Sequence, residues 1–174
     1  MSKSLILDAD RCVGCGACVV TCMDQNDIYP EKGEPAFRRI YQIENPGQEG
    51  GGALIQYASA GCRHCADSPC LIGCPTGAIY RDEKSQAILV NEDRCIGCHS
   101  CALACPFGVP RYDSEDKMHK CNLCTERLEA GMQPACVKVC PFNALRYEEA
   151  NAVQDGREYL YLSAALEASG KAGA

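Results

Sequence analysis

The chain has 174 residues, 16 of them cysteine, and a formal net charge of −6. That length allows one compact domain or two small fused ones, and cysteine at about 9% is typical of a disulfide scaffold or a metal protein. The acidic balance, without a basic tract, argues against binding to nucleic acid, because such binding depends on clustered Lys and Arg. No run approaches the ~18 apolar residues of a membrane helix, so we expect no direct membrane insertion.

The N-terminal segment, residues 1–8, predicts a short strand and no export signal. It has no extended apolar run and no twin arginine, so we expect a cytoplasmic protein. Cytoplasmic thiols stay reduced, which favours bound metal over disulfides. Leu5, Ile6 and Leu7 form an apolar run that predicts a strand leading into the first group of cysteines.

The first cysteine group has the spacing C-x2-C-x2-C-x3-C, as in bacterial ferredoxins. Its members are Cys12, Cys15, Cys18 and Cys22. In that motif three closely spaced thiolates hold three corners of an iron–sulfur cluster, and the fourth cysteine, one helical turn further, serves a different cluster. The motif therefore requires a partner motif elsewhere in the chain.

A pair of strands is predicted after this group. Residues 36–43 alternate polar and apolar side chains, and residues 54–57 form the expected partner strand. The glycine-rich residues 47–52 between them predict a flexible loop. Arg38 and Arg39 form the only basic doublet of the sequence, and we expect both on the solvated face of the first strand.

Three further cysteine groups follow, and each ends in a Cys-Pro pair. They are Cys62, Cys65, Cys70 and Cys74; Cys95, Cys98, Cys101 and Cys105; and Cys121, Cys124, Cys136 and Cys140. The group at 95–105 repeats the spacing of the first group. The other two differ from it only in the loop between their second and third cysteines. No cysteine of the chain is left over.

The remaining predicted elements are short. Residues 78–80 and 87–90 predict a hairpin between the second and third groups, and residues 144–147 predict a matching strand after the fourth. Residues 125–130 predict a helix that ends at Gly131. The expected architecture is α+β, with short elements around inorganic centres that supply much of the folding free energy.

Zinc is the main alternative metal. It also takes four cysteines from paired C-x2-C motifs, but structural zinc sites usually separate two such pairs by a longer stretch. Because each site already has four thiolates, we expect His64 and His99 to be surface residues or neighbours of the ligands that tune potential, and we assign no ligand role to His119. No spare cysteine nucleophile and no dinucleotide-binding motif is present, which argues against an active site.

The four groups resemble those of a known family, the iron–sulfur subunits that accompany molybdenum or tungsten bis-pterin oxidoreductases such as formate dehydrogenases, dimethyl sulfoxide reductases and tungsten aldehyde oxidoreductases. The resemblance spans residues 5–148. Met23 departs from it, because it stands where the other three groups have proline. The resemblance implies two ferredoxin-like halves related by pseudo-two-fold symmetry, in which the first motif pairs with the fourth and the second with the third.

The resemblance also implies four [4Fe–4S] clusters as cofactors, which we number 1 to 4. Their ligand sets would be Cys12, Cys15, Cys18 and Cys140; Cys22, Cys121, Cys124 and Cys136; Cys62, Cys65, Cys70 and Cys105; and Cys74, Cys95, Cys98 and Cys101. Residues 1–148 would form the four-cluster domain, with one half built from 12–22 and 121–140 and the other from 62–74 and 95–105. Residues 149–174 would form a C-terminal docking or packing segment.

The implied function is electron transfer without catalysis, between a molybdenum or tungsten bis-pterin catalytic subunit and another redox subunit or carrier. A flavin subunit and a second copy of the chain are further candidate partners. A freestanding polyferredoxin carrier and a zinc-binding structural module are the alternative functions.

Overall fold

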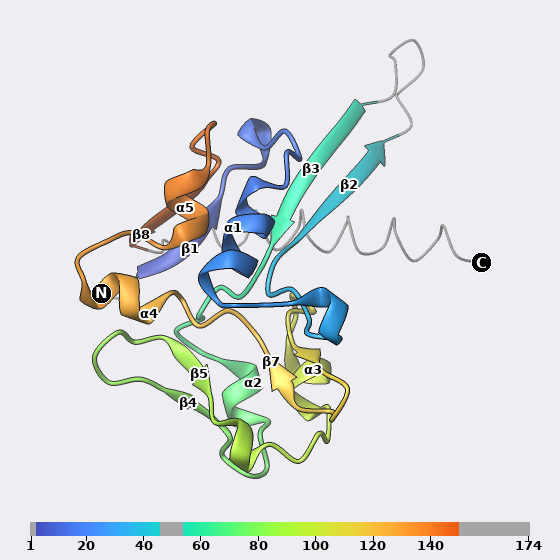
Figure 1. Cartoon of the computed structure of the whole chain (residues 1–174), viewed down its shortest axis with the longest axis vertical. Coiled ribbons are helices and arrows are strands. Elements are labelled where there is room, and N and C mark those ends of the chain that lie inside the picture. Colours follow the sequence, from blue (N-terminus) through green and yellow to red (C-terminus); the bar gives the residue numbers. More distant parts are fainter. Residues whose placement is uncertain (1–2, 46–53, 150–174) are drawn as a thin grey trace.

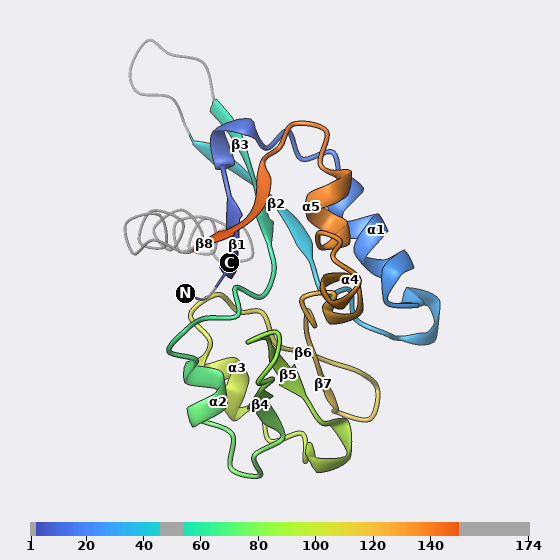
Figure 2. The ribbon, with the colours of Figure 1, turned by 90° about the vertical axis from the view of Figure 1, so that its left-hand side faces the viewer.

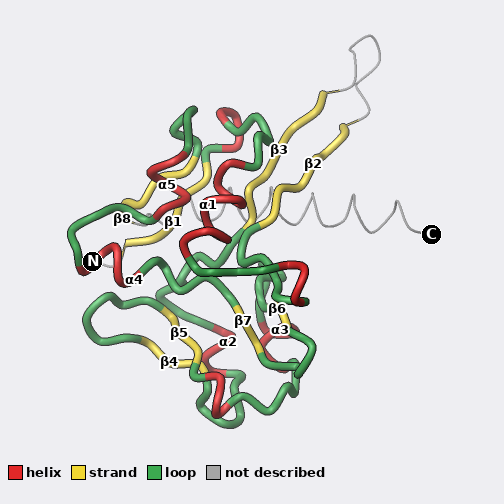
Figure 3. The backbone as a smooth tube through the Cα atoms, in the orientation of Figure 1, coloured by secondary structure: helices red, strands yellow, loops and turns green. Residues whose placement is uncertain are grey.

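The computed structural model describes residues 3–45 and 54–149, which form a small α+β structure of short elements. The strands are β1 (Lys3–Leu7), β2 (Arg39–Asn45), β3 (Leu54–Ala60), β4 (Ile79–Arg81), β5 (Ile88–Val90), β6 (Arg111–Tyr112), β7 (Met118–His119) and β8 (Leu145–Glu149). The helices are α1 (Ala17–Gln25), α2 (Pro69–Ile72), α3 (Ser100–Ala104), α4 (Thr125–Glu129) and α5 (Ala135–Val139). Loops occupy much of the path between these elements (Figure 3).

Strand β1 pairs with strand β8 and so joins the two ends of the described chain. The pairing is antiparallel and sets Leu7 opposite Leu145. It continues one step further, where the Asp8 N–H donates to the Ala144 carbonyl at 2.7 Å. Because Cys12 lies four residues after Asp8 and Cys140 lies four residues before Ala144, this pairing sets the first and fourth cysteine groups beside each other.

Strands β4 and β5 form a hairpin with a corresponding role. Ile79 lies opposite Val90, and the Asn91 N–H donates to the Ala78 carbonyl at 2.8 Å. Cys74 lies four residues before Ala78, and Cys95 lies four residues after Asn91. The hairpin therefore sets the second and third cysteine groups beside each other.

The elements gather into two parts. One part contains β1, β8, α1, α5 and the β2–β3 hairpin, and the other contains α2, α3, β4, β5, β6 and β7 (Figures 1 and 2). Helix α1 packs against α5 in the first part, and α2 packs against α3 in the second. The two helices of each pair carry cysteines from different groups. These are the same two groups that the strand pairing of that part sets beside each other.

The buried core combines aliphatic side chains with cysteine sulfur. Leu5, Leu123 and Leu145 are each buried, and they share one core cluster with buried cysteines from the first, second and fourth groups. A second core cluster in the other part contains Ile79, Ile88, Cys101 and Met118. No described helix is long and apolar enough to cross a membrane.

Most of the predicted elements are confirmed. The strands at 5–7, 54–57, 78–80, 87–90 and 144–147 and the helix at 125–130 lie within one residue of, or inside, the observed elements. The β6–β7 hairpin was not predicted, because two-residue strands carry no periodicity. The loop at 47–52 lies outside the described residues, and so does the C-terminal segment apart from Glu149, which ends β8.

One expectation is wrong. Arg38 is not solvated: its exposed fraction is 4%, whereas its neighbour Arg39 is exposed as expected. Strand β2 begins only at Arg39, so Arg38 lies in the preceding loop, and its side chain is buried. A buried guanidinium needs a compensating charge, and its surroundings among the ligand sulfurs, described below, provide one.

Gly14, in the first cysteine loop, packs against the ring of Tyr57 in β3. It has a φ of +69°, and a Cβ at this position would overlap the ring of Tyr57. Gly16 has a similar φ of +76°, but a Cβ added at Gly16 would meet open space.

We predict that Gly14→Ala lowers the Tm of the iron-loaded protein by several degrees more than Gly16→Ala, because overpacking adds about 1–3 kcal/mol to the backbone strain that both share. Anaerobic thermal unfolding at one scan rate measures this, and equal Tm values would show that Tyr57 moves aside freely.

Candidate metal centres

One cavity in the first part of the molecule is lined by four cysteines. Cys12, Cys15 and Cys18 reach it from the loop and first turn of α1, and Cys140 reaches it from the end of α5. Apolar side chains, among them Ile40, complete the wall. These are the four sulfurs predicted for cluster 1, and they come from residues more than a hundred positions apart.

A second cavity with the same construction lies in the other part. Its cysteines are Cys95, Cys98 and Cys101, from the loop and first turn of α3, and Cys74, which follows α2. Met118 and other apolar side chains line the remainder. These are the four sulfurs predicted for cluster 4.

Among the other eight cysteines, the effects on Cys22 and on Cys70 indicate two sets of neighbours. Burial, together with the sulfurs of Cys121 and Cys136, raises the pKa of Cys22. Burial and the sulfurs of Cys62 and Cys105 raise the pKa of Cys70 to about 11. The sulfurs that act on Cys22 and on Cys70 are those predicted to share clusters 2 and 3 with them, including Cys124 in the first set and Cys65 in the second.

The sulfurs suit an inorganic cluster as ligand. All 16 cysteines are free of disulfides, so each can supply the thiolate that a bound cluster requires. In the two cysteine cavities the sulfurs lie around a space with apolar walls, and no group of three or more His, Cys, Asp or Glu in the described chain is arranged to hold a single metal ion. A cubane of alternating iron and sulfide is a ligand that fits four sulfurs spread around such a space.

Polar groups donate hydrogen bonds to several of the ligand sulfurs. Backbone N–H groups donate from Met118 to Cys95 at 3.4 Å, from Leu123 to Cys121 at 3.3 Å and from Ala144 to Cys140 at 3.3 Å. The Tyr112 hydroxyl lies 3.1 Å from the Cys101 sulfur. Such dipoles favour the anionic sulfur of a bound cluster and help to set its reduction potential.

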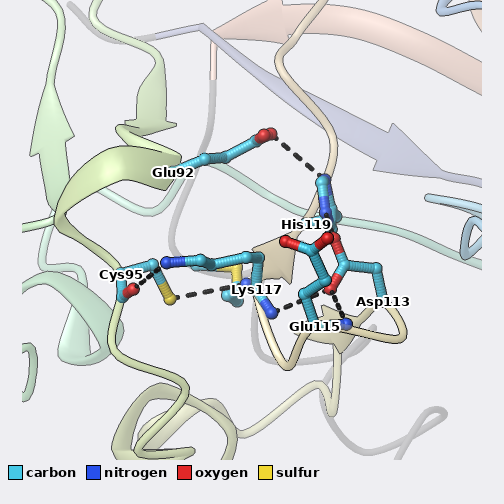
Figure 4. Close-up of polar contacts among 7 residues, drawn as sticks. Glu92, Cys95, Asp113, Glu115, Lys117 and His119 are labelled. Atoms are coloured by element: carbon cyan, nitrogen blue, oxygen red, sulfur yellow. Dashed lines mark hydrogen bonds and ion pairs between the residues drawn. The ribbon is translucent and has the colours of Figure 1, made fainter.

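The β6–β7 hairpin holds Cys95 in place (Figure 4). Its turn is fixed by Asp113, whose Oδ1 accepts from the backbone N–H of Lys117 at 2.9 Å. The Lys117 ammonium donates to the Cys95 carbonyl at 2.7 Å. His119 contacts Glu92 at 3.2 Å and Asp113 at 2.7 Å, so both of its ring nitrogens face carboxylates rather than a metal site.

His64 has an orphaned polar atom in the interior. It is 3% exposed, and its Nδ1 accepts the Ile88 N–H at 3.0 Å, which leaves the ring hydrogen on Nε2. Buried Nε2 makes no hydrogen bond to the described residues, and the groups that act on the ring are Cys62 and Cys121. Of the two roles expected for His64, the surface one is therefore wrong. Cys62 belongs to the set predicted for cluster 3 and Cys121 to the set predicted for cluster 2, so a cluster bound at either site would offer the acceptor that Nε2–H lacks.

Cationic side chains are also buried among the sulfurs, and Arg38 and Lys120 are two of them. Arg38 interacts electrostatically with Cys136, Cys121, Cys18 and Cys22. The Lys120 ammonium donates to the carbonyls of Ile88 and Cys121 and acts on the sulfurs of Cys62 and Cys70. Burial of cations without paired carboxylates is costly unless other negative charge is present. The positive charges therefore fit anionic clusters held by these cysteines.

Several of the groups around the sulfurs were not predicted from the sequence. Ser59, whose Oγ lies 3.2 Å from the Cys18 sulfur, and Tyr112 come from elements distant in sequence, so no spacing connects them to a cysteine group. Lys120 directly precedes Cys121, and a basic residue beside a ligand could have drawn attention to it. His99 was noted, and it stacks on Tyr112 with ring centroids 3.7 Å apart.

Comparison with protein families defines the class. Residues 53–150 match the model of a 4Fe-4S dicluster domain, and residues 11–79 match a second model with the same description. The two models together cover all four cysteine groups. The chain is thus an iron–sulfur protein of the dicluster class.

Comparison with individual proteins narrows the class. The chain is 41% identical over 148 residues to the probable anaerobic dimethyl sulfoxide reductase chain YnfG of Escherichia coli, covering 81% of this chain and 70% of that protein. It is 43% identical over 147 residues to the thiosulfate reductase electron transfer subunit PhsB of Salmonella typhi, with 82% and 73% covered. It is 36% identical over 163 residues to a sulfite dehydrogenase subunit of Allochromatium vinosum, with 81% and 66% covered.

The chain belongs to the family of electron-transfer iron–sulfur subunits of molybdopterin oxidoreductases. Its cofactors are four [4Fe–4S] clusters, as the two dicluster matches and the 16 cysteines require. When bound, these clusters supply one-electron redox chemistry, and the residues described above hold them and set their surroundings.

We predict about 16 iron and about 16 acid-labile sulfide ions per chain after anaerobic preparation, because four cubane clusters contain that many. The protein should be brown, with a broad absorbance near ~400 nm that dithionite bleaches. Iron and sulfide assays with an absorbance spectrum test this. A value of about 12 iron would mean that one site is not a [4Fe–4S] cluster, and a colourless zinc protein would contradict the assignment of cofactor.

Proposed function

We propose that the chain is a non-catalytic relay that passes electrons between a molybdenum or tungsten bis-pterin catalytic subunit and another redox subunit or carrier. The observation that carries the proposal is the arrangement of the cysteines, in which each group contributes to two sets of sulfurs. Two clusters that share one C-x3-C helix are held close together. Closely spaced one-electron centres are what a path for electron tunnelling requires.

The ligand sets proposed for clusters 1 to 4 are those implied by the sequence motifs. Support for clusters 1 and 4 comes from the two cavities, each lined by all four cysteines of its set. Support for clusters 2 and 3 comes from the electrostatic effects of Cys121, Cys124 and Cys136 on Cys22, and of Cys62, Cys65 and Cys105 on Cys70.

We also propose that residues 1–148 form two ferredoxin-like halves related by pseudo-two-fold symmetry. Two hydrogen bonds in matching positions support this. Asp8 donates to Ala144 across β1–β8, and Asn91 donates to Ala78 across β4–β5. In both cases the donor precedes a ligand cysteine by four residues and the acceptor follows one by four, and both donors are followed by a 3-10 turn.

The entry and exit points of the relay are proposed at clusters 1 and 4. Cys15 and Cys98 are the exposed cysteines of the chain, and they belong to these two sets. They lie in different parts of the molecule, so a partner could contact each end. We propose a cytoplasmic location, because 16 reduced thiols are needed for cluster assembly. Residues 149–174, a flavin subunit and a second copy of the chain are proposed as further contacts of this relay.

The role as a subunit predicts a stable complex. Anaerobic affinity purification of the tagged chain from its native cell, followed by native mass spectrometry and elemental analysis, should give a complex that contains molybdenum or tungsten as well as iron. A parallel purification with the tag alone is the control. A chain recovered by itself with its full iron content would instead favour the freestanding carrier.

The proposed ligand sets predict which cysteine substitutions act as one unit. The double variant Cys12→Ser/Cys140→Ser should lose one cluster, as either single variant does, because both residues serve cluster 1 and effects within a unit do not add. Cys12→Ser/Cys136→Ser affects two sets and should lose two clusters. Iron assays and electron paramagnetic resonance (EPR) spectra measure the loss, and alanine versions exclude ligation by the serine oxygen. If Cys12 and Cys136 behaved as the unit instead, each motif would bind its own cluster.

A further inference from the structure

Arg38 is a buried cation without a carboxylate partner in the described chain. It is 4% exposed, and the hydrogen bonds that fix it come from its Nη1 to the Ser59 carbonyl at 3.3 Å and to Ser59 Oγ at 3.0 Å. Burial of an unpaired charge is costly, and two neutral acceptors do not offset that cost. Something anionic in the surroundings must therefore stabilise this guanidinium.

The anionic surroundings of Arg38 are the cysteine sulfurs of clusters 1 and 2. Burial disfavours its charge, but the sulfurs of Cys136 and Cys121, then Cys18 and Cys22, outweigh burial and raise the pKa of Arg38. Ser59 extends the contact, because its Oγ lies 3.2 Å from the Cys18 sulfur. Three of the four sulfurs belong to the set proposed for cluster 2, and Cys18 belongs to cluster 1.

The backbone at Gly61 leaves the space that the guanidinium occupies. A Cβ at Gly61 would lie 2.9 Å from Arg38 Nη2 and 3.0 Å from Cζ, both too close for an undisturbed contact. The guanidinium thus packs directly on backbone and is held between Gly61 and Ser59. A fixed position distinguishes Arg38 from a mobile surface arginine whose charge water screens.

We propose that Arg38 raises the reduction potential of cluster 2 and, to a smaller extent, of cluster 1. Both clusters would then accept an electron more readily. The proposal rests on the ligand sets proposed above. Reduction adds one electron to a cluster, and no proton is required in the step. The reduced cluster is more negative, so a fixed positive charge stabilises it more than the oxidised cluster.

The test is a redox titration monitored by EPR, with a neutral variant and a charged one. Arg38→Gln keeps a donor for Ser59 and removes the charge, whereas Arg38→Lys keeps the charge. In Arg38→Gln we expect the ratio of reduced to oxidised cluster 2 at a given potential to fall at least tenfold. For a one-electron centre this corresponds to a decrease of about 59 mV in reduction potential. Cluster 1 should shift less, clusters 3 and 4 should not shift, and Arg38→Lys should restore most of the difference.

The neighbouring residue provides the matched control. Arg39→Gln removes the same charge from an exposed position on the same segment, and it should leave all four potentials unchanged because solvent screens the charge. The signal of cluster 2 is identified as the one that Cys136→Ala abolishes. Equal shifts in Arg38→Gln and Arg39→Gln would overturn the proposal, since net charge alone would then explain the effect.

Iron content separates the possible failures. If Arg38→Gln keeps its full iron and no potential changes, the proposal for Arg38 is overturned while the ligand sets stand. If the signal with the largest shift is not the one that Cys136→Ala abolishes, the assignment of ligand sets is wrong. If Arg38→Gln loses iron, Gly61→Ala decides, because it keeps the arginine but displaces the guanidinium; unchanged potentials in that variant would overturn the proposal.

Discussion

The bond between cysteine sulfur and iron is the interaction on which this structure depends. The described helices and strands are too short to stabilise one another, since the longest helix has nine residues and β6 and β7 have two each. Seven of the 16 cysteines are buried, so sulfur makes up much of what would otherwise be an aliphatic core. We expect sixteen sulfur–iron bonds to supply folding free energy that so little apolar area cannot, because metal binding and folding are coupled in small domains.

The same constraint orders the tertiary structure. A cluster that takes three sulfurs from one loop and the fourth from a distant helix can form only after both segments meet, and the β1–β8 pairing and the β4–β5 hairpin bring such segments together. Strand pairing and ligation therefore support each other. The elements outside these pairs position polar groups instead, since the β2–β3 hairpin carries Ser59 and the β6–β7 hairpin carries the groups that bond to Cys95 and Cys101.

The interior charges follow from the charge of the clusters. Arg38, His64 and Lys120 would be poor choices for an ordinary apolar core, because each brings a polar or charged group out of water. Next to anionic clusters, Arg38 and Lys120 compensate the accumulated negative charge, and His64 offers a hydrogen-bond donor, so all three influence how easily a cluster accepts an electron. Of the 16 cysteine residues, Cys15 and Cys98 are exposed, and the others are half-buried or buried.

The sequence alone determined the cofactor type, the number of ligands and the family, because the spacing of thiolates around a cubane is fixed by bond geometry within a few residues. It also identified the strands with clear periodicity, such as β1 and the β4–β5 hairpin. It could not place Arg38, since a basic doublet has the same appearance on a solvated strand as beside a buried anion. Nor could it connect Ser59 to Cys18 or Tyr112 to Cys101, because these contacts join residues with no common spacing. Only the tertiary structure decided which polar groups meet the sulfurs, since long-range packing selects them rather than local pattern.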